Sequence, residues 1–290
     1  MRELLTPRDL ADAIGVSESS LRRWIDGGRI KTARTVGGHR RVALPEAVRF
    51  IRDSGAIVVR PELLGLNDLS AYVPGKSDDQ ADLEYIHDAL LQGDEVRVRN
   101  LVLSMYLAGR SVAWICDGPL RHAMHRIGEL WLHSPAGIMV EHRATDICLR
   151  TLHALYLTLT PPPADAPVAI GAAPQDDPYL LPSLMAGIVL FDAGFRAVNF
   201  GPDTPLQLLG ESAEMHKARL VWLAFSSPID KAQLGEQLAA LARTLAAHKA
   251  DLVVGGRQVD TSALRELKNT HVAQSMAELA AFARGLLAQR

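Results

Sequence analysis

The chain has 290 residues, of which 48% are hydrophobic and 22% charged, a composition typical of globular proteins with two or three domains. No apolar run approaches the roughly 20 residues of a membrane span, and no signal-peptide pattern is present, so we expect a cytoplasmic protein without membrane contact. Residues 1–60 contain twelve Lys and Arg against seven Asp and Glu, about +5, which leaves about −7 on the remainder and is typical of a nucleic-acid-binding domain on a regulatory body.

The first 55 residues predict three short helices and a hairpin. Thr6, which precedes a proline, has the pattern of a helix start, and Ser17 begins a second helix that ends at Gly27–Gly28. Pro45 opens a third helix. Between the second and third helices the segment RIKTARTVGGHRRVAL predicts two short strands joined at Gly37–Gly38.

The second helix and the hairpin carry side chains suited to DNA. A recognition helix presents short polar side chains and arginines to the major groove, and a basic hairpin lies along phosphates or in the minor groove. Leu21, Trp24 and Ile25 are expected to face inward. The candidate DNA-contacting residues, of which the four arginines at 22, 23, 40 and 41 are the strongest, are Ser19, Ser20, Arg22, Arg23, Arg34, Thr35, His39, Arg40 and Arg41.

The order of these elements resembles the MerR and excisionase-like winged helix-turn-helix family, in which GGHRR recurs in the wing. The resemblance implies binding of a double-stranded DNA operator with palindromic or repeated half-sites. It also implies a homodimer, because the two-fold symmetry of such operators matches a two-fold protein.

The middle of the chain predicts a four-helix bundle. A weakly structured linker with a short helix precedes it, and four amphipathic segments follow, separated at Gly93, Cys116–Pro119 and Ser134–Gly137. Cys116 and Cys148 lie in apolar helical stretches, so we expect both to be reduced core residues. The run TPPPADAP at 160–167 ends the bundle.

After this hinge, short apolar strands alternate with helices, including a long helix at 230–249, a short one near 261–267 and a C-terminal one. This pattern predicts a parallel sheet in an α/β doubly wound, flavodoxin-like (Rossmann-like) domain. The predicted strands are 168–173, 196–200, 219–225, 251–256 and 270–273. The expected domains are a winged helix-turn-helix with linker at 1–72, the bundle at 78–162 and the α/β domain at 166–290.

Motifs in the last two domains resemble one subfamily of regulators. Trp131 and Glu141–His142, separated by nine residues, match a Wx9EH signature, and GPDTP at 201–205 and Gly255–Gly256 match positions in the α/β domain. The chain is thereby similar to the light-sensing, adenosylcobalamin-dependent repressors of the CarH/LitR type. The resemblance implies that Trp131 covers the upper face of the corrin with Glu141 and His142 beside it, and that small residues leave room for the nucleotide tail. It further implies a homotetramer that forms with the cofactor and breaks in light.

The loop after the first strand departs from that family. There the family has ExHxxG, whose His ligates cobalt, whereas this chain has Asp177-Pro178-Tyr179-Leu180-Leu181-Pro182. A phenol is a poor neutral ligand beside imidazole, and Pro182 lacks a backbone N–H. The family's Ser-x-Val/Ser strand end is Ala224-Phe225-Ser226 here, which predicts a lost hydroxyl and an aromatic ring in the tail pocket.

We therefore predict a DNA-binding transcriptional regulator, in the role of a repressor, whose sensory module no longer takes His-ligated adenosylcobalamin. The module would bind another planar or tetrapyrrole-like ligand, bind cobalamin with the cofactor's own base, or bind nothing and act through oligomerisation or protein contacts. The candidate cofactor-binding residues are Trp131, Glu141, His142, Tyr179, Ser226, Gly255 and Gly256.

Enzymatic functions have weaker support, and no catalytic residue is predicted. A corrinoid-carrying methyltransferase subunit would lack its cobalt-ligating His and would have no use for a DNA-binding head. His122 and His125, with Glu129 a turn later, suggest a metal-binding helix face, but we expect surface or pocket-rim residues and no metal. Asp176–Asp177 resembles the Mg²⁺-binding pair of receiver domains, but no matching phospho-acceptor Asp or Lys ends a later strand.

Overall fold

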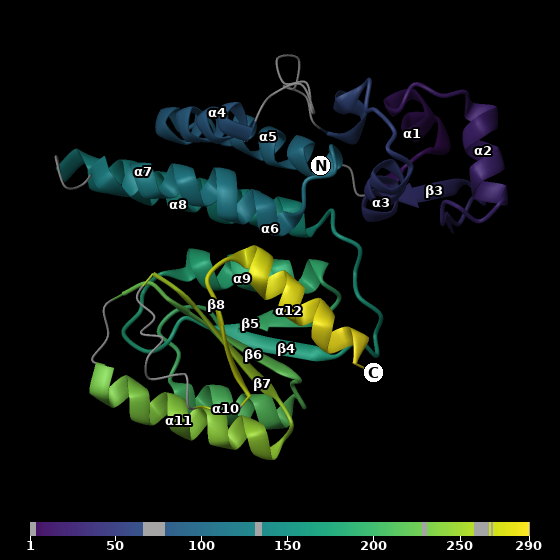
Figure 1. Ribbon diagram of the computed structural model, residues 1–290. Coiled ribbons are helices and arrows are strands. Elements are labelled where there is room, and N and C mark those ends of the chain that lie inside the picture. The colour runs from purple at the N-terminus through teal and green to yellow at the C-terminus, as the bar shows by residue number, and fades with distance from the viewer. Residues whose placement is uncertain are drawn as a thin grey trace. The chain divides into compact units, whose positions relative to one another are not determined.

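The computed structural model describes residues 4–65, 79–130, 135–227, 231–257, 267 and 269–289, with the backbone alone for 231–234 (Figure 1). The chain divides into two compact units, one formed by residues 1–111 and 118–160, the other by residues 112–117 and 161–290. The predicted short helix near 261–266 lies outside the described residues. The domain boundaries inferred from the sequence remain a prediction.

The N-terminal part of the first unit has the predicted helices and hairpin. Its elements are β1 (Leu4–Leu5), α1 (Pro7–Ala13), α2 (Glu18–Asp26), β2 (Ala33–Arg34), β3 (Arg40–Ala43), α3 (Leu44–Ser54) and the 3-10 turn η1 (Pro61–Leu64). Strand β1 is a finding beyond the prediction: Leu4 and Leu5 pair antiparallel with Ala43 and Val42, which completes a sheet in the order β1-β3-β2. Two residues are too few for a pattern of alternation to reveal.

Local interactions explain where α1 and α2 begin. Thr6 and Asp9 form a capping box, in which the Asp9 N–H donates to Thr6 Oγ1 and the Thr6 N–H donates to Asp9 Oδ2, each at 3.0 Å. Ser17 accepts from the Ser20 N–H at 3.1 Å at the start of α2. Both predicted helix starts are confirmed. The aromatic rings of Trp24 and Phe50, 5.1 Å apart, join α2 to α3.

The rest of the first unit is helical. Its helices are α4 (Asp79–Gln92), α5 (Glu95–Leu107), α7 (Arg121–Glu129) and α8 (Pro135–Tyr156). Side chains connect them in pairs: Arg150 Nη1 lies 2.8 Å from Glu95 Oε2, between α8 and α5, and Arg126 Nη1 lies 2.6 Å from Glu84 Oε2, between α7 and α4. Cys148 is buried in α8, and burial raises the pKa of its thiol to about 12, which matches the expected inert core cysteine.

The predicted helix break at Cys116–Pro119 is wrong. Short helix α6 (Val112–Ile115) continues through a π-helical turn at Cys116–Leu120 into α7, and the chain instead leaves the helix after Leu107, where Gly109 has a φ of 97°. A π turn accommodates the proline without ending the helix. Residues 112–117 belong to the second unit, where the Asp117 carboxylate accepts from the N–H groups of Met276 and Ala277 at 2.8 and 2.9 Å and so caps α12.

The second unit is the predicted doubly wound α/β domain. Its elements are β4 (Val168–Ala172), α9 (Leu180–Asp192), β5 (Arg196–Asn199), α10 (Leu206–Met215), β6 (Leu220–Phe225), α11 (Lys231–Ala247), β7 (Asp251–Gly256), β8 (Thr270–Ala273) and α12 (Met276–Ala288). All strand pairs are parallel, in the order β5-β4-β6-β7-β8, which is the flavodoxin-like order 2-1-3-4-5. The fold class predicted from the sequence is confirmed.

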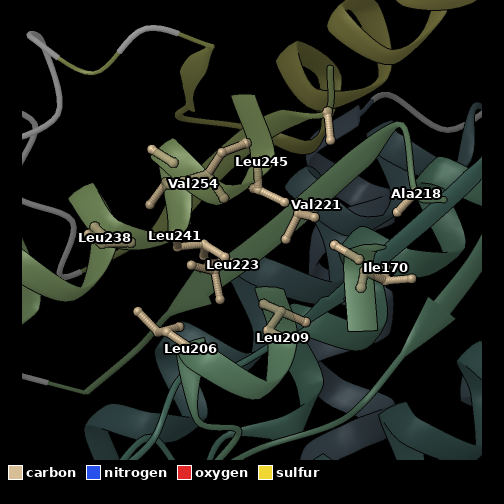
Figure 2. Packing of buried hydrophobic residues seen from close by; sticks show 14 of the residues in the cluster. Ile170, Leu206, Leu209, Ala218, Val221, Leu223, Leu238, Leu241, Leu245 and Val254 are labelled. Carbon is tan, nitrogen blue, oxygen red and sulfur yellow. The ribbon is translucent and has the colours of Figure 1, made fainter. Parts of the chain in front are cut away.

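Helices cover both faces of this sheet, with α10 and α11 on one face and α9 and α12 on the other (Figure 1). Alternate residues of β6 therefore point in opposite directions. Val221, Leu223 and Phe225 belong to the hydrophobic cluster with α10 and α11, and Figure 2 shows Val221 and Leu223 within it. Trp222 lies on the other face, where its Nε1 donates to the Ser183 carbonyl of α9. The carboxyl ends of β4, β6 and β7 meet at one edge, where ligands bind in folds of this kind.

Candidate functional site

The exposed face of α2 carries the predicted recognition residues. Ser19, Arg22 and Arg23 are exposed and Ser20 is half-buried, whereas Leu21 and Ile25 are buried on the opposite side, as predicted. Arg22 Nη2 lies 2.6 Å from Glu18 Oε1 one turn earlier, which holds the guanidinium along the helix. The exposed face of α2 therefore presents hydroxyl and guanidinium donors beside the capped start of the helix.

The hairpin extends beside α2. The Thr35 N–H donates to the His39 carbonyl at 2.9 Å and the Gly38 N–H to the Thr35 carbonyl at 2.8 Å, with Gly38 at a φ of 76°. Arg34 and His39 are exposed. Val36 at the tip is fully exposed. An apolar tip flanked by donors suits insertion into a groove.

One arginine of the hairpin connects it to the helix. Arg40 Nη1 lies 2.6 Å from Asp26 Oδ1 at the end of α2, and Arg41 Nη1 donates to the Arg40 carbonyl at 3.1 Å. The two guanidinium groups therefore have defined positions. All nine sequence-predicted residues lie on α2 or on the hairpin and its turn, and Arg40 links these two elements.

An ion-pair network behind this surface supports it. Glu46 accepts from the Lys31 N–H at 2.7 Å and pairs with Arg49, which also donates to the Arg29 carbonyl at 2.8 Å and pairs with Asp53. Burial opposes ionisation of Glu46, but the hydrogen bonds and charges of Arg49 and Lys31 prevail and lower its pKa. The network joins α3 to the segment between α2 and the hairpin.

At the sheet edge of the second unit, the acidic residue in the loop after β4 accepts hydrogen bonds from backbone N–H groups. Asp177 is fully buried. Its carboxylate accepts from the N–H groups of Ser226 at 2.5 Å, Ser227 at 3.1 Å and Tyr179 at 3.1 Å. The residue therefore joins the loop after β4 to the end of β6, and candidate Ser226 takes part through its backbone N–H.

Tyr179 occupies the N-cap position of α9 and is about half exposed. Pro182 lies in the first turn of this helix, where a backbone N–H has no intrahelical partner, so the proline favours the helix start instead of distorting the loop. The N–H that Pro182 lacks is therefore one that the helix does not use.

Gly255 and Gly256 are explained by close packing of the backbone. A Cβ on Gly255 would lie 2.8 Å from the Ala273 carbonyl oxygen, and one on Gly256 would lie 2.0 Å from the Phe225 carbonyl oxygen. Gly256 also has a φ of 117°, which disfavours other residues. These glycines serve strand pairing among β6, β7 and β8, and the ring of Phe225 lies in the cluster with α10 and α11.

Trp222 is the feature of this site that the sequence analysis missed. Its indole is fully buried on the α9 face of the sheet and donates from Nε1 to the Ser183 carbonyl at 3.2 Å. A Cβ on Gly171 of β4 would lie 2.1 Å from the indole Cδ2, and one on Gly187 of α9 would lie 3.1 Å from Cζ2. Two glycines therefore make room for one large ring, and that ring fills the space between α9 and the sheet. The sequence signal for this packing is a tryptophan within an apolar strand together with a glycine in each neighbouring element.

The upper-face residues implied by the resemblance are placed only in part. Trp131 lies outside the described residues. Glu141 and His142 lie on α8, where Thr145 Oγ1 donates to Glu141 Oε1 at 3.1 Å and the His142 side chain is 69% exposed. His142 is thus a surface residue of the helix.

The acidic pair considered for Mg²⁺ does not form a carboxylate site. Asp177 is committed to three backbone N–H groups, and Asp176 has a φ of 66° with its own N–H bonded to Asp203 Oδ1 at 2.9 Å. Among the described residues, three or more metal-binding side chains converge at Glu84, His87 and Asp88 on α4. The sequence analysis overlooked this Glu-x-x-His pattern. On α7, His125 pairs with Glu129 at 3.5 Å, whereas His122 turns toward Glu84.

Within the described ranges, no helix is long and apolar enough to cross a membrane.

Comparisons with known proteins add two family matches. Residues 4–46 match a family model described as a helix-turn-helix domain, and residues 83–156 match one described as a B12 binding domain. The second match lies on helices α4 to α8 and ends before β4. No curated protein gave a significant match. The chain thus combines a helix-turn-helix domain, which indicates DNA binding, with a B12 binding domain, which indicates a corrinoid-sensor architecture.

One solved structure shares the fold of the larger part of the chain, and two others are similar at lower TM-scores. The monomethylamine corrinoid protein of Methanosarcina barkeri is 21% identical, with a TM-score of 0.55 over 72% of this chain and 100% of its own. A cobalamin-binding protein from Desulfitobacterium hafniense DCB-2 is 14% identical, with a TM-score of 0.38 over 72% of this chain and 98% of its own. The methanol:cobalamin methyltransferase complex MtaBC of Methanosarcina barkeri is 14% identical, with a TM-score of 0.39 over 80% of this chain and 91% of its own.

Proposed function

We propose that this chain is a MerR-like transcriptional repressor whose sensory module derives from an adenosylcobalamin-binding one but does not hold a corrinoid through a protein histidine. The observation that carries the proposal is the loop after β4. Tyr179 stands where the resemblance implies the cobalt ligand, and the neighbouring Asp177 gives its carboxylate to three backbone N–H groups.

The DNA-binding half of the proposal rests on the helix-turn-helix match and on the surface formed by α2 and the hairpin. Arg22 and Arg23 on the helix and Arg40 and Arg41 on the hairpin supply donors for bases and phosphates. Operators with two-fold symmetry require a dimer, so we propose a homodimer or homotetramer. The domains would be 1–72, 78–162 and 166–290.

The residues of the α/β unit do not fit a His-ligated corrinoid. The phenol of Tyr179 is not a neutral nitrogen donor, and Trp222 fills the interior between α9 and the sheet beside Gly171 and Gly187. Gly255 and Gly256, implied as space for a nucleotide tail, are required by backbone packing against Phe225 and Ala273. The input to the regulator is then another planar ligand, cobalamin with its own base, or a protein contact.

An absorption spectrum tests the proposal. The full chain, purified from a culture supplied with corrinoid or mixed with adenosylcobalamin in the dark, should lack the absorption bands of a His-ligated corrinoid. Its affinity for a DNA duplex selected from random sequences should be the same in light and dark. A corrinoid bound through a protein histidine would overturn the proposal, whereas light-dependent DNA binding without such a ligand would indicate another chromophore.

Substitution at the ligand position sharpens the test. Tyr179→His restores a nitrogen donor at the N-cap of α9, and we expect it to raise affinity for cobalamin. If the single variant binds cobalamin no more tightly than the wild type, the double variant Tyr179→His, Trp222→Gly tests whether the indole also prevents binding. Tyr179→Phe is the matched control, because it removes the hydroxyl without adding a ligand.

The competing function is a corrinoid carrier of a methyl-transfer system, which the B12 binding match favours. It requires stoichiometric corrinoid on the purified chain. The spectrum and the DNA-binding measurement together separate the two functions, because a carrier would be coloured and its corrinoid would not alter DNA affinity.

A further inference from the structure

Three side chains of α4 lie together on one side of the helix. Glu84, His87 and Asp88 are spaced at i, i+3 and i+4, so they share a face. Their ligand-type atoms lie within 4.8 Å of one another, and His87 Nδ1 is 3.2 Å from Asp88 Oδ1. His87 is buried, whereas Asp88 is exposed and Glu84 is half-buried. The group therefore has an inner nitrogen donor and two oxygen donors nearer to solvent.

Helix α7 brings a further histidine next to Glu84. His122 Nε2 lies 3.6 Å from Glu84 Oε1. This nitrogen is buried and has no hydrogen-bond partner among the described residues, although a buried ring nitrogen ordinarily has one. An unsatisfied buried nitrogen beside a carboxylate oxygen requires something between or around them, and a cation bound by both would satisfy it.

The orientation of Glu84 suits this arrangement. Arg126 Nη1 lies 2.6 Å from Glu84 Oε2 and holds that oxygen, while Oε1 faces His122 at 3.6 Å and also accepts a long hydrogen bond from Gln80 Nε2 at 3.3 Å. A metal-binding carboxylate commonly has such a partner on its other oxygen.

We propose that Glu84, His87, Asp88 and His122 form a binding site for one divalent transition metal ion, Zn²⁺ in the first instance, between α4 and α7. Two imidazole nitrogens and two carboxylate oxygens from two helices make a four-donor set that Zn²⁺ accepts, whereas Mg²⁺ and Ca²⁺ prefer oxygen donors alone. The ion would fix α7 against α4. The site lies within the residues that match the B12 binding family, but it needs no corrinoid, because all four donors are side chains of α4 and α7.

Calorimetric titration of the full, untagged chain with ZnCl₂ after treatment with EDTA tests the site. One Zn²⁺ should bind per chain. His122→Gln and Asp88→Asn should each weaken binding at least about tenfold, since even groups that only orient metal ligands contribute about 10- to 100-fold. Both positions are partly exposed, so these variants should fold, which circular dichroism checks.

His125→Gln and Glu129→Gln are the matched controls. They alter a histidine–carboxylate pair on the same helix, 3.5 Å apart and more exposed, and should leave Zn²⁺ affinity unchanged. Zn²⁺ should also raise the unfolding temperature of the wild type and of these controls, but not that of His122→Gln. Absence of Zn²⁺ binding by the wild type would overturn the proposal, as would equal losses in the His125 and His122 variants, which would indicate adsorption to surface histidines.

Discussion

The proposed DNA-binding surface of the first unit and the sheet edge of the second use polar residues in opposite ways. On α2 and the hairpin, Arg22 and Arg40 remain accessible and are held by ion pairs with Glu18 and Asp26. At the sheet edge, the most chemically promising carboxylate, Asp177, is buried and serves only backbone groups. Exposed side chains held by a single ion pair are available to a binding partner, whereas buried side chains whose hydrogen bonds are all made stabilise the fold. Substitutions in the two regions should therefore affect different measurements.

The largest effect is expected at Trp222. Trp222→Ala should lower the free energy of unfolding by about 3–5 kcal/mol, because it empties the space between α9 and β4. Gly171→Ala should cost about 1–3 kcal/mol through overpacking against the indole. Denaturant titration followed by circular dichroism measures both. In the Trp222→Ala background the cost of Gly171→Ala should nearly vanish; additive costs would mean that the two residues are not coupled.

Asp177→Ala should destabilise the α/β unit by about 3 kcal/mol, because three N–H groups lose their acceptor. Asp177→Asn keeps one acceptor oxygen and should cost less. Unfolding curves of the two variants give the comparison. Increased corrinoid or Mg²⁺ binding with unchanged stability would instead assign Asp177 to a ligand site.

In the DNA-facing region, single substitutions of Arg22, Arg23, Arg40 or Arg41 by Ala should leave stability almost unchanged. They should reduce affinity for a selected DNA duplex about 5- to 150-fold where a base contact is lost, equivalent to about 1–3 kcal/mol. For a phosphate contact, the slope of log affinity against log salt should fall by about one. Fluorescence anisotropy measures both. Arg243→Ala, at an exposed position of α11, is the control. If the control loses as much affinity as these variants, the assigned surface is wrong.

The smallest effect concerns Glu46. Its pKa is lowered in the folded protein from an ordinary value near 4.5, so its contribution to stability is complete above that value and is lost as the pH falls through the lower, folded-state pKa. The contribution should be below about 1 kcal/mol because the pair with Arg49 is near the surface. Unfolding at pH 6 and pH 3 should differ less for Glu46→Gln than for the wild type. An identical pH dependence of the variant and the wild type would mean that ionised Glu46 does not contribute to stability.

Sequence reasoning worked where signals are local. The caps at Thr6 and Ser17 and the turn at Gly37–Gly38 involve residues within a few positions of one another, and the five apolar strands of the α/β unit each carry their own pattern. The π turn was missed because Gly118 and Pro119 ordinarily end a helix, and only the surrounding structure determines whether a π turn absorbs them.

The amino-acid sequence by itself therefore determined most of the order of elements, the fold class and the candidate DNA-contacting residues, because helix caps, tight turns and hydrophobic periodicity act over short stretches of chain. Tertiary structure alone decided which polar groups are still available for chemistry. Asp177 meets Ser226 across 49 residues, Trp222 fills the room left by Gly171, and His122 meets Glu84 across two helices. No local pattern specifies such pairings, since they depend on how separate elements pack.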